Sequence, residues 1–130
     1  MIKKLPQGVK ISITRSIQQA FEQYMAKIHW NEDVYDLNEF AKEWKTYIQT
    51  QASWYDKIDE DIKTNATFHE ELAQKINATI KKTLTEAPTK EQIDEIETMQ
   101  KELGTSMEYS CKAEAKYVQE ELARKKKTVH

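Results

Sequence analysis

The stretch Tyr35-Asp36-Leu37-Asn38-Glu39-Phe40 carries the clearest structural signal in the chain. Asp36 can cap a helix, Glu39 at the third helical position completes a capping box, and Tyr35 with Phe40 can form a hydrophobic staple. Apolar residues then recur with helical spacing: Leu37, Phe40, Ala41, Trp44, Tyr47, Ile48, Trp54, Tyr55, Ile58 and Ile62. This pattern predicts a helix over residues 36–63 with one broad, aromatic face.

On the N-terminal side, a second helical stripe predicts a helix over residues 12–30. Its members are Ile13, Ile17, Ala20, Phe21, Tyr24 and Ile28. Before it, Val9, Ile11 and Ile13 alternate like a strand, but a single short strand has no partner. We therefore expect residues 1–11 to form a loose, basic arm.

On the C-terminal side, the signals at residues 64–67 conflict. Thr67 and Glu70 form a second capping-box pattern, which favours a break. Leu72, Ile76 and Ile80 instead continue the phase of the preceding stripe, which favours one helix of about fifty residues. We predict a break or kink, because so long a helix is uncommon outside coiled coils, and a separate helix over residues 67–85.

A turn is expected at residues 85–89, since Pro88 disfavours helix at Ala87 and Thr89 with Gln92 forms another capping box. Beyond it, one apolar phase continues across Gly104, which predicts a single helix over residues 89–126, with a kink as the alternative. Residues 127–130 are expected to be a disordered tail. The predicted fold is all-α: residues 12–126 form one antiparallel three- or four-helix bundle with coiled-coil character, built on a long helical hairpin.

The composition excludes several classes of protein. The chain has 130 residues, of which 32% are charged and only four are Gly or Pro, too few for most β folds or phosphate-binding loops. No apolar run reaches the length of about 18 residues that crosses a membrane, and no signal-peptide pattern follows Met1. A single cysteine excludes an internal disulfide. We expect a cytoplasmic protein with no membrane insertion.

Patterns typical of catalysis are missing. A di-metal helical bundle needs Glu-x-x-His, whereas Ala26 and Ala66 stand three residues before His29 and His69. Cys111 lies within an apolar stripe, where a thiol usually behaves as a small buried hydrophobe. We therefore expect no enzyme activity, no cofactor, no metal and no small-molecule substrate.

A candidate protein interface lies on the helix expected at 36–63. On a helical wheel Gln51 falls about 20° from Phe40, in the middle of the apolar stripe, where a polar side chain needs a partner. One interpretation is a hydrogen-bond network within the chain, and the other is an interface with another protein, itself or a heterologous partner. The candidate interface residues are Trp44, Tyr47, Gln51, Trp54 and Tyr55.

The basic ends of the chain support an alternative, the binding of nucleic acid or an anionic surface. Residues 1–31 carry five basic residues and one acid, and Arg124, Lys125, Lys126 and Lys127 form a candidate basic patch. The twenty-one acids between them would repel a polyanion, so nucleic acid is not the expected partner.

A lesser alternative rests on Tyr117 and Glu121. Their Tyr-x-x-x-Glu spacing resembles the export signal of small helical-hairpin proteins secreted by bacterial type VII systems.

Overall fold

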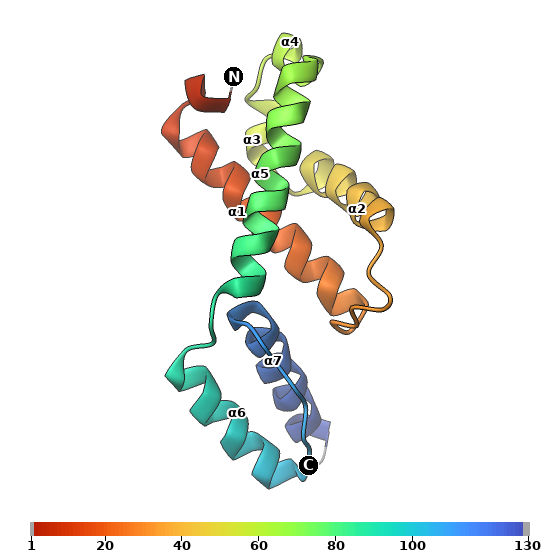
Figure 1. Ribbon diagram of the computed structural model, residues 1–130, viewed down its shortest axis with the longest axis vertical. Helices are drawn as coiled ribbons and strands as arrows, with labels where there is room; N and C mark the ends of the chain where they lie inside the picture. The colour runs from red at the N-terminus through yellow and green to blue at the C-terminus, as the bar shows by residue number, and fades with distance from the viewer. Residues whose placement is uncertain (1, 129–130) are drawn as a thin grey trace. The chain divides into compact units, whose positions relative to one another are not determined.

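The computed structural model describes residues 2–128, and the part of the chain that it describes is all-α (Figure 1). A short 3₁₀ helix at Ile2–Lys4 precedes α1 (Gln7–Lys27), α2 (Leu37–Thr50), α3 (Ser53–Asp56), α4 (Glu60–Lys63), α5 (Ala66–Thr85), α6 (Lys90–Leu103) and α7 (Lys112–Thr128). The chain divides between Lys81 and Lys82 into two compact units. The all-α class is confirmed, and the chain forms two compact units over the range for which the sequence predicted one helical bundle, residues 12–126.

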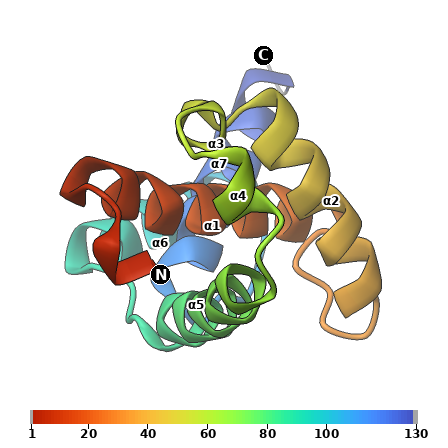
Figure 2. The ribbon, with the colours of Figure 1, turned by 90° about the horizontal axis from the view of Figure 1, so that it is seen from above.

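The first unit is built around α1, which packs against α2, α3 and α5 (Figures 1 and 2). Ile13, Ile17 and Phe21 are almost completely buried along one face of α1. Phe21 meets Phe40 of α2 edge to face, with ring centroids 5.8 Å apart, and Phe68 buries its side chain from α5. Aromatic pairs of this geometry add stability beyond the area that they bury.

The N-terminal arm is largely helical, which corrects the expectation for residues 1–11. Pro6 occupies the N-cap position of α1, and its carbonyl accepts from the backbone N–H groups of Val9 and Lys10. A proline fits here because the first N–H groups of a helix have no partner within it. At the other end α1 stops at Lys27, three residues earlier than predicted, since His29 and Trp30 adopt left-handed backbone.

The single helix predicted over residues 36–63 is also wrong, because the chain breaks at 51–52 and again at 57–59. Asp36 caps α2 as expected, accepting from the N–H groups of Asn38 and Glu39 at 2.8 and 3.3 Å. No glycine or proline stands at 51–52 or 57–59, so the sequence contains no helix-breaking residue that would predict these two breaks. A further break lies at Thr64–Asn65, where the Asn65 side chain, and not Thr67, accepts from the first N–H groups of α5.

The second unit contains a helical hairpin made by α6 and α7. Thr89 and Gln92 form the capping box at the start of α6, with hydrogen bonds of 2.9 and 3.1 Å. Gly104 then ends α6 in left-handed backbone (φ 66°), so the continuous helix predicted over 89–126, which was to form one arm of the long hairpin, is wrong. Five residues from both helices form the core of this unit: Ile96, Met99, Ala115, Val118 and Leu122.

The tail predicted at residues 127–130 lies partly within α7, which extends to Thr128. Val129 and His130 lie outside the described residues.

Candidate functional site

Three of the five predicted interface residues lie in the core of the first unit. Trp44, Tyr47 and Trp54 are each at least nine-tenths buried. The Trp54 indole Nε1 donates to Ser16 Oγ at 2.9 Å, and the Tyr47 hydroxyl donates to Gln19 Oε1 at 2.5 Å. Because α1 supplies both acceptors, these aromatic side chains join α2 and α3 to α1 and are not available to a partner.

The other two predicted interface residues, Gln51 and Tyr55, reach the surface. Gln51 follows the last residue of α2, so its side chain leaves the apolar stripe and is exposed, where it accepts from Gln23 Nε2 at 3.5 Å. Tyr55 is half-buried, with the Lys63 ammonium 4.5 Å from its ring centroid. The structure therefore does not assemble the five residues into one surface, because the helix that was to carry them ends at Thr50.

The apolar stripe of α2 is wider than the surface that α1 covers. Phe40, Trp44 and Tyr47 face α1, whereas Leu37, Ala41 and Ile48 occupy the neighbouring sector of the helix, about 40° wide at 100° per residue. Leu37 is 59% exposed, Ala41 is exposed and Ile48 is half-buried. We call Leu37, Ala41 and Ile48 the α2 flank.

Sequence reasoning missed the α2 flank, although its signal was present. The helical pattern assigned Leu37, Ala41 and Ile48 to the same apolar stripe as the residues that the structure buries in the core. The width of the stripe, about 120° over its predicted length, was the signal that one covering helix could leave part of it uncovered.

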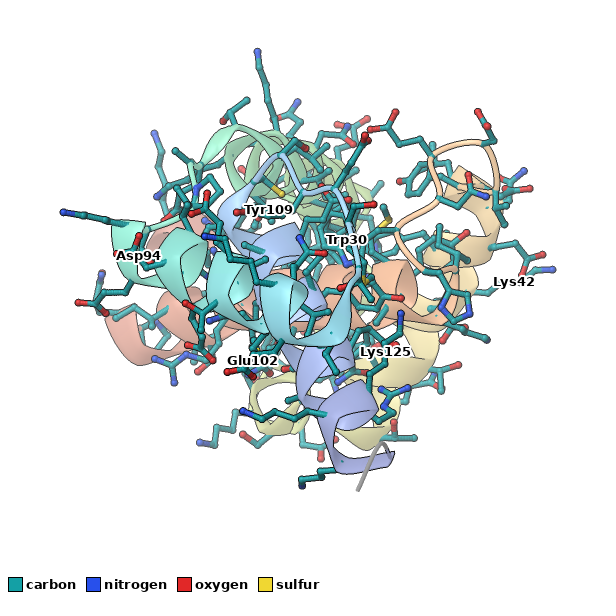
Figure 3. All side chains as sticks on the ribbon, turned by 90° about the horizontal axis from the view of Figure 1, so that it is seen from below. Trp30, Lys42, Asp94, Glu102, Tyr109 and Lys125 are labelled. Atoms are coloured by element: carbon teal, nitrogen blue, oxygen red, sulfur yellow. The ribbon has the colours of Figure 1, made fainter. Side chains whose placement is uncertain are left out.

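Two lysines and a glutamine border the α2 flank on the side away from the core. Lys42, Lys45 and Gln49 follow one another at helical spacing and are all exposed. Figure 3 shows Lys42 projecting outward from α2. The Lys42 ammonium lies 3.8 Å from the Glu39 carboxylate, whereas Lys45 forms no ion pair within residues 2–128. The α2 flank is thus an apolar strip whose polar edge carries positive charge.

The predicted basic patch at the end of the chain is dispersed. Arg124, Lys125, Lys126 and Lys127 are consecutive on α7, so at about 100° per residue they point in four directions around the helix. Arg124 pairs with Glu121 at 2.9 Å and Lys126 pairs with Glu102 of α6 at 3.1 Å. Glu102 and Lys125 mark this end of the hairpin in Figure 3. The four cations do not form one cationic face.

Tyr117 and Glu121 lie one turn apart on α7, and both are half-buried. Burial raises the pKa of Tyr117 above its usual value, and the nearby Glu121 carboxylate raises it further. The turn of the α6–α7 hairpin contains Gly104 but no tryptophan. Members of the type VII export family carry Trp-x-Gly at their turn, so this chain departs from their pattern there.

His69 and Cys111, which were considered for catalysis, belong to different compact units. The His69 ring lies within hydrogen-bond distance of the Lys63 carbonyl, and the Cys111 side chain is 1% exposed. Within residues 2–128, no three His, Cys, Asp or Glu side chains come close enough to hold a metal ion. The same residues include no helix that is both long enough and apolar enough to span a membrane.

Comparisons with protein-family models, with curated proteins and with solved structures give no match to this chain. The function is therefore argued from the geometry alone.

Proposed function

We propose that this is a non-enzymatic helical protein that acts by binding another protein through the α2 flank. The observation that carries the proposal is that Leu37 and Ala41 are exposed, and Ile48 is half-buried, beside two exposed lysines. Apolar surface with a polar rim is typical of protein–protein contacts, and an i, i+4, i+11 spacing is how a helix presents anchors to a groove.

The charge beside the flank favours a heterologous partner. Lys45 has no carboxylate partner in the described residues, and the only one of Lys42 there is the exposed Glu39 at 3.8 Å. Acidic side chains of another protein would therefore form ion pairs with both lysines. A second copy that docked through the same flank in antiparallel orientation would bring the lysines of both copies to the same edge, where they repel. The partner that fits is a protein with an apolar groove and an acidic rim.

The other functions that the sequence raised receive less support. Binding of nucleic acid through the basic end of α7 would need cations gathered on one face, and two of those four are paired with glutamates. Export by a type VII-like system stays a lesser alternative that rests on Tyr117 and Glu121. We place the protein in the cytoplasm, an assignment argued from its single cysteine and its composition.

Photocrosslinking tests the proposal and finds the partner. A photoreactive residue in place of Ala41 should crosslink the partner in lysate of the native host, whereas the same residue in place of Leu84, an exposed leucine on α5, should not. The crosslink should also weaken as the salt concentration rises, because the rim contacts are ionic. Equal crosslinking from both positions, or none from Ala41, contradicts the proposal. A crosslink between two copies of the chain would move the assignment from a heterologous partner to self-association.

A further inference from the structure

A second surface, separate from the α2 flank, lies along the N-terminal half of α1. A cleft of about 440 Å³ opens there, lined by Gln7, Lys10, Ile11, Thr14, Arg15 and Gln18 of α1 and by Lys75 of α5. The six residues of α1 recur every three or four positions and so share one face of the helix. The cleft is open to solvent, so a ligand bound there would stay partly exposed.

The lining of this cleft is cationic. Lys10, Arg15 and Lys75 come from two helices, and the lining contains no acidic side chain. None of the three forms an ion pair with any residue between 2 and 128. In a chain with 22 acids and a net charge of −2, three uncompensated cations around one cleft create a local positive field.

The other lining residues also favour an anion. The amides of Gln7 and Gln18 can donate, whereas the Thr14 hydroxyl already donates to the Lys10 carbonyl at 3.3 Å. Ile11 is 50% exposed and offers an apolar contact beside the charges. The cleft can thus hold several negative charges at one place and an uncharged part of the same ligand next to them.

We propose that this cleft binds a ligand that carries two or more linked phosphate groups. One carboxylate would satisfy one or two of the three cations, whereas linked phosphates spread their charge along a chain. The planar guanidinium of Arg15 matches two phosphate oxygens at once, and the lysines act as point charges. This inference does not depend on the proposed function, because the two surfaces share no residue.

Titration with inorganic tripolyphosphate at low salt tests this site in the full chain. We expect amide NMR shifts centred on Thr14, Arg15 and Lys75, and a dissociation constant at least tenfold weaker in the double variant Arg15→Gln/Lys75→Gln. The matched control Lys42→Gln/Lys45→Gln removes the same charge from α2 and should bind like the wild type. Circular dichroism checks that both variants fold. Absence of shifts in the wild type, or an equal loss in the control, overturns the proposal.

Two further arms identify the source of the phosphates. Binding to vesicles that contain a phosphorylated inositol lipid, displaced by tripolyphosphate, assigns the site to a lipid headgroup. Tripolyphosphate binding without vesicle binding assigns it to a soluble ligand. Binding of a single-stranded oligonucleotide by a protein that ignores tripolyphosphate contradicts the proposal, since it makes the surface a nucleic-acid site.

Discussion

Within the described residues, left-handed backbone occurs at His29, Trp30 and Gly104, and these residues end α1 and α6. The Trp30 N–H donates to the Met25 carbonyl at 2.7 Å, and its indole packs edge to face on Phe21 with centroids 6.1 Å apart. Such a conformation costs a side-chain-bearing residue about 1–2 kcal/mol, which the burial of the indole offsets. Gly104 adopts it without that cost.

Replacing Gly104 with alanine should lower the free energy of unfolding of the second unit by about 1 kcal/mol. No atom lies within 4 Å of the added Cβ, so the loss reflects backbone strain and not a clash. Urea unfolding followed by circular dichroism measures it. Gly8→Ala is the matched control, because Gly8 is helical and also has open space, and it should stabilise by about 0.5–1 kcal/mol. Equal effects at the two sites would contradict the explanation.

The buried tyrosine Tyr47 should make stability fall at high pH. Burial raises the pKa of its hydroxyl above the ordinary value of 10.0. A raised folded-state pKa means that the stabilisation is present below pH 10 and is lost as the pH rises through the folded-state pKa. In Tyr47→Phe the decrease in unfolding free energy between pH 9 and 11 should be smaller, although loss of the bond to Gln19 costs about 1 kcal/mol at neutral pH. An unchanged pH dependence would show that Tyr47 does not titrate in this range.

At the scale of elements, the sequence predicted which segments are helical better than where they end. The apolar periodicity of α1 and α2 and the capping residues Asp36 and Thr89 are local signals, and they appear where expected. The breaks at 51–52 and 57–59 depend on packing instead. Trp54 and Ile58, which lie at or just after these breaks, are both buried. Gly104 is a residue that commonly ends a helix, but the apolar residues on both sides of it keep one helical phase. The sequence therefore predicted a continuous helix where the structure has a turn.

Substituting Asp36 tests how far a local signal stabilises its element. Asp36→Ala removes the acceptor for two N–H groups at the start of α2 and should cost about 1 kcal/mol. Asp36→Asn keeps an acceptor and should cost much less, because asparagine caps nearly as well. Thermal and urea unfolding of the first unit give both values. Similar losses in the two variants would assign the effect to charge rather than to capping.

At the scale of the whole molecule, the division into two units was not predictable from the helix pattern. Each unit has its own core, one around α1 and the other between α6 and α7. The candidate interface included three residues that are buried, and the cause is similar. Periodicity places residues on one face of a helix but does not say how much of that face another helix covers. Which residues of α2 are buried and which belong to the exposed α2 flank depends on how α1 packs against α2.

The two cores should be separable by mutation. Leu122→Ala removes a fully buried side chain from the second unit and should destabilise it by about 2–5 kcal/mol. All three tryptophans lie in the first unit, so their fluorescence should report its unfolding while circular dichroism reports both units. In the variant we expect the circular dichroism transition to move to lower urea and the fluorescence transition to stay. Transitions that shift together would mean that the chain unfolds as one cooperative body.

The central claim is that the α2 flank binds a partner. Its most direct test is the affinity of the photocrosslinked partner for three purified proteins: wild type, Leu37→Ser and Leu84→Ser. Both leucines are exposed, so neither change should disturb folding. We predict that Leu37→Ser weakens binding at least tenfold, or about 1.4 kcal/mol, while Leu84→Ser leaves it unchanged. Equal affinities for all three proteins would contradict the claim.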